Sequence, residues 1–121
     1  MNISIIVPVY NEEENIESLY ATLIETLRNI DVVDIYEIIF VDDGSTDQTY
    51  SKLKSINNIK VNVIRLKKNM KKTAALHTGF KEAMFGIIAT LDADLQYDPL
   101  DIRGMLKKIE EGYDCVCGWR Y

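Results

Sequence analysis

The sequence predicts an α/β fold in which a mainly parallel sheet is covered by helices on both faces. Short runs rich in Ile and Val alternate with longer amphipathic stretches along the chain. Most of the short runs are continuously hydrophobic, which is typical of strands buried on both faces. The 121 residues, of which 47% are hydrophobic and 27% charged, suit one globular domain with its own core. We therefore expect a single three-layer domain over residues 1–121.

The expected elements alternate between strand and helix. The strand candidates are residues 3–9, 37–41, 61–66, 87–91 and 114–118. The helix candidates are residues 14–29, 46–55, 73–85 and 99–111. In the first helix an apolar stripe recurs at helical spacing, at Ile16, Leu19, Leu23 and Leu27. Strand–helix alternation implies crossover connections and a mainly parallel sheet.

Three local patterns predict where helices begin and end. Ser45 with Gln48 three residues later has the form of a capping box. Asp98 followed by Pro99 predicts an N-cap with proline at the first helical position. Gly112 is expected to close the last helix.

Composition narrows the possible partners and compartments. The formal net charge of -5 argues against a nucleic-acid-binding surface, which would carry a broad basic face. No apolar run reaches the roughly 18 residues of a membrane span, and Met1 is not followed by the basic start of a secretory signal. Cys115 and Cys117 are expected to be packing thiols in a reducing compartment. We therefore expect a soluble, cytoplasmic chain.

Acidic turns follow three of the expected strands. They are residues 8–12, 42–45 and 92–96. In an open parallel sheet, ligands bind beyond the carboxyl ends of the strands, where like charges repel unless a cation lies among them. Asp92, Asp94 and Gln96 place hard oxygen ligands at alternate positions, which suits Mg²⁺ or Mn²⁺ rather than zinc. Aspartates that only cap turns are the alternative, but their position after buried strands favours a metal site.

No glycine-rich phosphate loop is present to replace such a metal. Neither G-x-G-x-x-G after a strand nor G-x-x-x-x-G-K-[ST] occurs in the sequence. A bound nucleotide would therefore depend on a cation to neutralise its phosphates.

Three segments resemble the signatures of a known family. Residues 5–13 (IIVPVYNEE), 41–47 (VDDGSTD) and 91–96 (LDADLQ) resemble, in order and position, the signature segments of family 2 glycosyltransferases with the GT-A fold. Residues 92–99 and 112–120 are similar to the branch that moves a sugar from a nucleotide onto a polyprenyl phosphate, such as dolichyl-phosphate mannose synthase. The resemblance implies the Rossmann-like, nucleotide-binding half of a catalytic domain that continues beyond residue 121.

The loop after the third strand also resembles that branch, with two departures. Residues 68–75 carry Lys71 where the branch has glycine and Lys68 where it has arginine. These departures bear on the contacts with the donor phosphates. Lys67, Lys68, Lys71 and Lys72 could attract phosphates or an anionic membrane surface, or could form a merely solvated loop.

The resemblance implies roles for nine side chains. The nucleotide-binding residues would be Pro8, Tyr10, Asn11, Glu12, Asp42, Asp43 and Asp92. Asp43 would accept a hydrogen bond from the base, and Asp42 would support its loop. The metal ligands would be Asp94, Asp92 and Gln96, and Asp92 and Asp94 would be the catalytic residues.

These roles imply a metal-dependent, inverting hexosyltransferase. It would move a sugar from a UDP- or GDP-linked donor to an acceptor, a polyprenyl phosphate, by direct displacement assisted by Mg²⁺ or Mn²⁺. An ionised phosphate acceptor needs no general base. The complete protein would act at the inner face of the membrane through residues absent from this chain, and the chain alone would be incomplete for catalysis.

Three other functions remain as alternatives. A sugar-phosphate nucleotidyltransferase would carry a glycine-rich, basic loop after the first strand, where this chain has residues 10–13. A receiver-like binding domain would carry an acidic pair there and a phosphorylatable Asp after the third strand, where this chain has Lys67 and Lys68. A binding-only domain with a vestigial site would bind the donor without any reaction.

Overall fold

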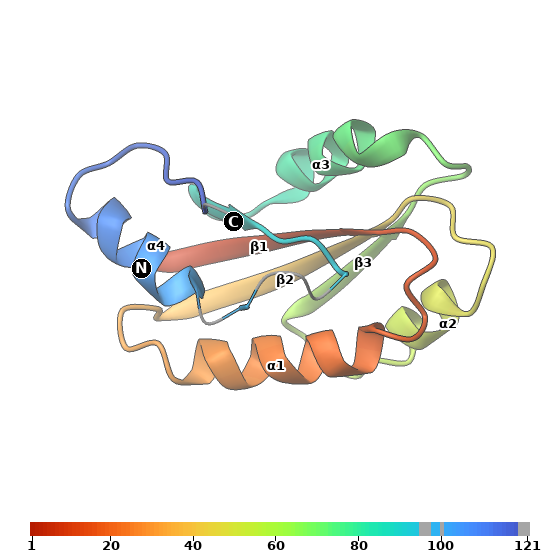
Figure 1. Ribbon diagram of the computed structural model, residues 1–121, viewed down its shortest axis with the longest axis horizontal. Helices are drawn as coiled ribbons and strands as arrows, with labels where there is room; N and C mark the ends of the chain where they lie inside the picture. The colour runs from red at the N-terminus through yellow and green to blue at the C-terminus, as the bar shows by residue number, and fades with distance from the viewer. Residues whose placement is uncertain (95–97, 100, 119–121) are drawn as a thin grey trace.

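The computed structural model describes residues 1–94, 98–99 and 101–118, and it has an alternating α/β architecture (Figure 1). The strands are β1 (Asn2–Val9), β2 (Ile35–Asp42), β3 (Val61–Arg65) and β4 (Ile87–Thr90). The helices are α1 (Ile16–Arg28), α2 (Thr49–Lys54), α3 (Lys71–Glu82) and α4 (Asp101–Glu110). The predicted fold class is therefore confirmed.

The four strands form one parallel sheet in the order β3-β2-β1-β4. The two central strands carry the longest apolar runs, and residues such as Ile5 and Ile38 are fully buried. Because all strands run in the same direction, the turns after β1, β2 and β4 lie at one edge of the sheet. This edge is where the sequence predicts the functional site.

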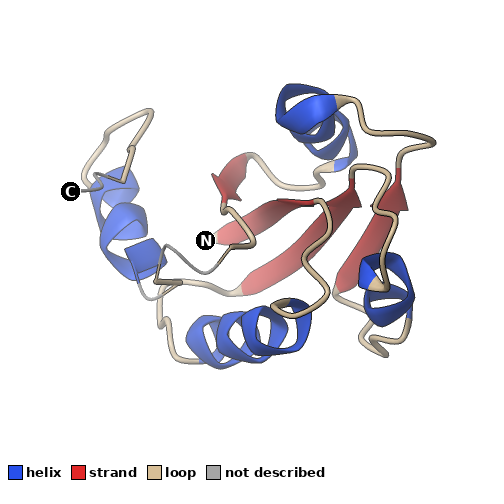
Figure 2. Ribbon diagram, turned by 45° about the vertical axis from the view of Figure 1, so that its right-hand side comes forward, coloured by secondary structure: helices blue, strands red, loops and turns tan. Residues whose placement is uncertain are grey.

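Helices cover both faces of the sheet, which gives the expected three layers (Figure 2). On one face, α1, α2 and α4 pack through buried residues such as Leu23, Leu53 and Leu106. On the other face, α3 packs through Ala75 against Ile6 and its neighbours on β2. Successive β1 residues therefore serve opposite cores, as the two-residue period of a strand requires.

Helix α3 lies unusually close to β1 at Gly79. A Cβ placed on Gly79 would lie 2.5 Å from Cγ2 of Ile6, nearer than real Cβ contacts approach. A glycine costs helix stability in isolation, so its use here reflects the space left by the strand.

The expected strand at residues 114–118 is not formed. The segment pairs with no strand in the part of the chain that the structure describes, and its residues are mostly exposed. Strand-forming side chains produce a strand only when a hydrogen-bonding partner lies alongside, so their pattern was misleading here.

The predicted capping box at Ser45 is also wrong. Helix α2 begins at Thr49, and Gln48 occupies its N-cap without a side-chain hydrogen bond. Instead, Asp47 Oδ1 accepts a hydrogen bond from the backbone N–H of Thr49 at 2.9 Å. Ser45 Oγ accepts one from the backbone N–H of Asn11 at 2.9 Å, so this serine joins two loops.

The ends of α4 agree only partly with the sequence. Asp98 and Pro99 lie in the turn before the helix, where the carbonyl oxygen of Asp98 accepts a hydrogen bond from Asp101 N–H at 2.9 Å. Gly112 follows the helix with φ of +108°, the left-handed conformation expected of a glycine at that place. No helix among the described residues is both long and apolar enough to cross a membrane.

Candidate functional site

The acidic turns surround a cleft of about 380 Å³ at the carboxyl edge of the sheet. Six of the predicted site residues line it: Pro8, Tyr10, Glu12, Asp43, Asp92 and Asp94. Three further lining residues are Asn69, in the loop between β3 and α3, and Lys71 and Lys72, in the first turn of α3. The two lysines are among those that the sequence suggested could attract phosphates, whereas Asn69 was not predicted as a site residue. The cleft therefore brings four carboxylates and two ammonium groups around one space.

Two other predicted residues lie outside this lining and hold the loops. Asp42 is fully buried, and its Oδ1 accepts a hydrogen bond from the backbone N–H of Ser45 at 3.0 Å. Asn11 Oδ1 accepts one from the backbone N–H of Thr46 at 2.8 Å. Direct contact of Asp42 and Asn11 with a nucleotide remains a prediction, and Gln96 lies outside the described residues.

Asp42 also meets a cation on the neighbouring strand. Arg65 Nε lies 3.6 Å from Asp42 Oδ2, a distance that allows charge attraction but no hydrogen bond. The guanidinium of Arg65 is held over the ring of Tyr50, with 4.3 Å between Cζ and the ring centroid. The buried charge at the end of β2 is therefore balanced from β3.

A hydrogen-bonded chain joins the turn after β1 to the start of α2. The backbone N–H of Glu12 donates to Thr49 Oγ1 at 2.9 Å, and this hydroxyl donates to Asp47 Oδ1 at 2.5 Å. Burial opposes ionisation of Asp47, but the hydrogen bonds from Thr49 outweigh it and hold the pKa of Asp47 below its ordinary value. Polar groups of the motifs at residues 5–13 and 41–47 thus hold the two loops together through hydrogen bonds.

Asp43 lies under the loop that precedes α3. Its side chain is buried, and its Oδ1 accepts a hydrogen bond from the backbone N–H of Met70 at 2.7 Å. Gly44 has φ of +76°, and a Cβ there would lie 2.6 Å from the carbonyl carbon of Lys68. Both the backbone conformation and the close approach of Lys68 therefore require glycine at position 44.

Asp92 is paired with Lys72 across the cleft. The ammonium Nζ of Lys72, near the start of α3, forms an ion pair with Asp92 Oδ1. The backbone N–H of Leu91 donates to the carbonyl oxygen of Ile6 at 3.0 Å, which continues the β1–β4 ladder up to this turn. Asp94, two residues further, is exposed at the same cleft. The sequence pattern gave no sign that Lys72 would meet Asp92.

The acidic residues of the cleft fit an open divalent site better than a closed cage. Within residues 1–94, 98–99 and 101–118, no three His, Cys, Asp or Glu side chains are grouped to hold a metal ion. Asp92 and Asp94 nevertheless supply hard oxygen donors beside open space. Mg²⁺ and Mn²⁺ accept such ligands and complete their coordination with water and substrate phosphates.

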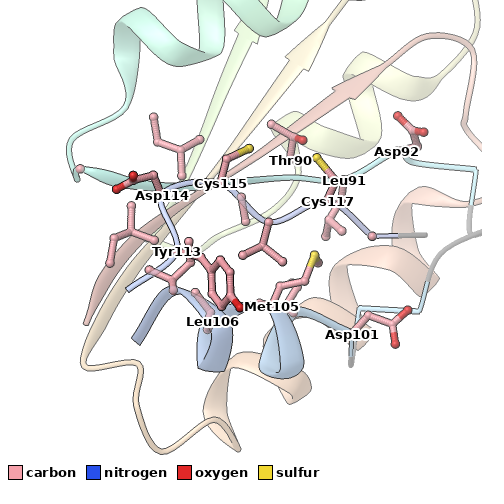
Figure 3. A pocket seen from close by; sticks show the side chains of 18 of the residues that line it. Thr90, Leu91, Asp92, Asp101, Met105, Leu106, Tyr113, Asp114, Cys115 and Cys117 are labelled. Carbon is pink, nitrogen blue, oxygen red and sulfur yellow. The ribbon is translucent and has the colours of Figure 1, made fainter. Parts of the chain in front are cut away.

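A larger groove of about 1030 Å³ lies between β4, α4 and the segment after α4 (Figure 3). Its lining includes Met105, Tyr113, Cys115 and Cys117, and Asp92 lines both this groove and the cleft. The two thiols are exposed, so the expectation that they pack in a core is wrong. A hydrogen bond to Cys117 and the charge of that neighbour raise the pKa of the Cys115 thiol.

Known proteins resemble the chain along nearly its whole length. The family model described as Glycosyl transferase family 2 matches residues 4–121. A dolichol-phosphate mannosyltransferase of Pyrococcus furiosus is 38% identical over 122 residues, covering 100% of this chain and 34% of the relative. An undecaprenyl-phosphate 4-deoxy-4-formamido-L-arabinose transferase of Proteus mirabilis is 38% identical over 117 residues, covering 94% of this chain and 35% of the relative. The chain spans about a third of the length of these relatives.

Solved structures share the fold. The mannosyltransferase PcManGT from Pyrobaculum calidifontis, in complex with GDP-Man and Mn²⁺, superposes with a TM-score of 0.72 at 26% identity, covering 87% of this chain and 31% of that one. TarS 1-349 of S. aureus, in complex with UDP, gives a TM-score of 0.69 at 27% identity, covering 92% of this chain and 32% of that one. The expected GT-A architecture is confirmed, and the chain belongs to glycosyl transferase family 2.

Proposed function

We propose that this chain is the nucleotide-sugar-binding part of a metal-dependent, inverting glycosyltransferase whose acceptor is a polyprenyl phosphate. The observation that carries the proposal is that one cleft is lined by Asp43, Asp92 and Asp94 together with two lysines, Lys71 and Lys72. A nucleoside diphosphate needs a hydrogen-bond acceptor for its base and positive charge for its phosphates, and these lining residues could provide both.

The base would lie beside Asp43. Met70 N–H takes one carboxylate oxygen, and no hydrogen bond to the second forms within the described residues. The second oxygen can accept an N–H of uracil or guanine, which both bases possess. The ring of Tyr10, which is 41% exposed at the cleft, offers a face for the nucleoside. The relatives with solved structures carry UDP in one case and GDP-Man in the other, so both bases are candidates.

The diphosphate would lie toward Asp92 and Asp94. These two carboxylates would hold Mg²⁺ or Mn²⁺, with Gln96 as a further predicted ligand. When bound, the cation draws charge from the diphosphate and so makes it a better leaving group. Lys72 orients Asp92 through its ion pair and adds positive charge beside the same phosphates.

The sugar would be transferred with inversion, by direct attack of the acceptor on the anomeric carbon. A phosphate acceptor is ionised near neutral pH and needs no base from the protein. The relatives from Pyrococcus furiosus and Proteus mirabilis are a dolichol-phosphate and an undecaprenyl-phosphate sugar transferase by name, which supports this acceptor class. The complete enzyme would work at the cytoplasmic face of the membrane, where residues outside this chain would provide the acceptor site.

A panel of nucleoside diphosphates tests donor binding. Thermal unfolding should be followed with UDP, GDP, ADP and CDP, each with Mn²⁺, with Mg²⁺ and with chelator. We expect UDP or GDP to raise the unfolding temperature only when Mn²⁺ or Mg²⁺ is present. A ligand at about 100 times its Kd stabilises the folded protein by about 2.7 kcal/mol, which is enough to shift the unfolding temperature measurably. Absence of any metal-dependent shift would remove the proposal.

Transfer requires a second measurement on a longer protein that contains this chain. Radiolabelled UDP-glucose or GDP-mannose, Mn²⁺ and a short polyprenyl phosphate should yield labelled sugar-lipid with that protein but not with residues 1–121 alone. Donor binding without transfer by the longer protein would indicate a vestigial site. Release of pyrophosphate from a nucleoside triphosphate and a sugar phosphate would indicate a nucleotidyltransferase instead.

A further inference from the structure

We propose that Lys71 binds the diphosphate of the donor and that the protein keeps this lysine in a strained backbone conformation for that purpose. This inference rests on the proposed function and adds a specific residue to it. Lys71 has φ of +76°, in the left-handed region that residues with a Cβ rarely adopt. Glycine would adopt the same backbone freely, so the strain comes only from having a side chain there.

Neighbouring groups hold Lys71 in this conformation. Its backbone N–H donates to Asn69 Oδ1 at 3.0 Å, and the preceding N–H, of Met70, donates to Asp43 Oδ1. Lys68 and Asn69 lie directly against Gly44, which leaves the loop little room to relax. Strain that the surroundings maintain in this way is typical of residues at functional sites.

The position of Lys71 makes the diphosphate the chemically suitable ligand. Lys71 lines the same cleft as Asp43, Asp92 and Asp94. Lys72 is already paired with Asp92, whereas Lys71 makes no ion pair with any residue in the described parts of the chain. The ammonium group of Lys71 is therefore available to form an ion pair with an incoming anion.

Formal charges in the cleft support the same assignment. Four carboxylates and two ammonium groups leave a formal charge of 2 − 4 = −2 among the lining residues. One divalent cation brings this sum to zero, which gives no net attraction for a diphosphate. Binding then depends on where the positive charges lie, and a lysine that is not committed to a carboxylate can approach the phosphate oxygens as a point charge.

Replacement of Lys71 by glycine separates this role from a structural one. Lys71→Gly should unfold at a higher temperature than the wild type, because it removes the strained side chain. The same variant should bind UDP or GDP, whichever the wild type prefers, about tenfold more weakly in calorimetry with Mn²⁺. Uridine or guanosine, which lack phosphates, should bind the variant and the wild type equally.

Two further variants complete the design. Lys71→Ala should lose the same diphosphate affinity without the gain in unfolding temperature, because alanine keeps the strained backbone. Lys67→Ala removes an exposed lysine that does not line the cleft and should bind like the wild type.

Each outcome supports or overturns the inference. Equal UDP or GDP binding by Lys71→Gly and the wild type would overturn the role of Lys71 while leaving the proposed function intact. An equal loss for diphosphate and nucleoside would also overturn it, because the variant would then have moved the whole loop. A wild-type protein that binds neither diphosphate would overturn the proposed function itself.

Discussion

The backbone N–H of Met70 and the carboxylate of Asp43 lie 2.7 Å apart and join two loops that are 27 residues apart in the sequence. This contact fixes the orientation of Asp43, because a carboxylate held at one oxygen presents the other in a defined direction. The loop after β3 thus helps to position Asp43 in the cleft, although the acidic motif itself follows β2. Changes in either loop should therefore affect nucleotide binding.

Asp43→Asn should weaken binding of the preferred nucleoside diphosphate by about 1.5–3 kcal/mol, the range for a hydrogen bond to a charged group. The amide oxygen of Asn can still accept from Met70 N–H, so the loop should remain in place and the unfolding temperature should change little. Lys67→Ala should lose only a screened surface charge and bind almost normally. Calorimetry that ranks the two variants in the opposite order would contradict the role of Asp43.

Asp94→Ala should abolish the metal-dependent binding of UDP or GDP. The reason is that Asp94 and Asp92 are the two carboxylates of the β4 turn that reach the cleft. Titration with Mn²⁺ and with chelator, at fixed nucleotide, measures the effect directly. A variant that keeps full metal-dependent binding would exclude Asp94 from the metal site, and a partial defect would transfer the main role to Asp92 or Gln96.

Asp47→Asn should make the stability of the folded protein less sensitive to acidification. The pKa of Asp47 is lower in the folded protein than in the unfolded chain, so its charge stabilises the fold above the unfolded value of about 4. This stabilisation is lost as the pH falls through the folded pKa. The gap in unfolding temperature between wild type and variant should therefore be larger at pH 6 than at pH 3. A gap that grows on acidification would contradict the sign of the shift.

Two glycine-to-alanine changes should act in opposite directions. Gly79→Ala places a methyl group against Ile6 and should destabilise the fold by about 1–3 kcal/mol, despite the better helix propensity of alanine. Gly104→Ala, in α4, meets no atom within 4 Å and should stabilise by about 0.5–1 kcal/mol. Urea unfolding of both variants measures the difference. Similar effects of the two changes would show that α3 can move away from β1.

The sequence was sufficient to predict the sheet core and the edge of the sheet at which the acidic turns meet. Buried runs around Ile5 and Ile38 predict strands by their hydrophobicity alone, and parallel strands must end at one edge. That rule brought Tyr10, Asp43 and Asp92 to the same cleft. The prediction failed at residues 114–118, because strand formation there depends on a partner and not on the local pattern.

The contacts between loops could not be predicted in the same way. Ser45 has the local pattern of a helix cap, but it accepts the N–H of Asn11, which is 34 positions away. The ion pair of Lys72 with Asp92 depends on how α3 packs over β1, and this is set by the close approach at Gly79. Such pairs arise from tertiary packing, and no short-range pattern in the sequence records them.

The position of the 68–70 segment over Gly44 makes the Met70 amide a natural reporter of cleft occupancy. Its proton can exchange with solvent only when the segment lifts from Gly44 and the bond to Asp43 breaks. A bound nucleoside would make that opening rarer and would slow exchange at this single site. Hydrogen–deuterium exchange or the amide resonance of Met70 would then follow donor binding in the unlabelled protein, without any added fluorophore.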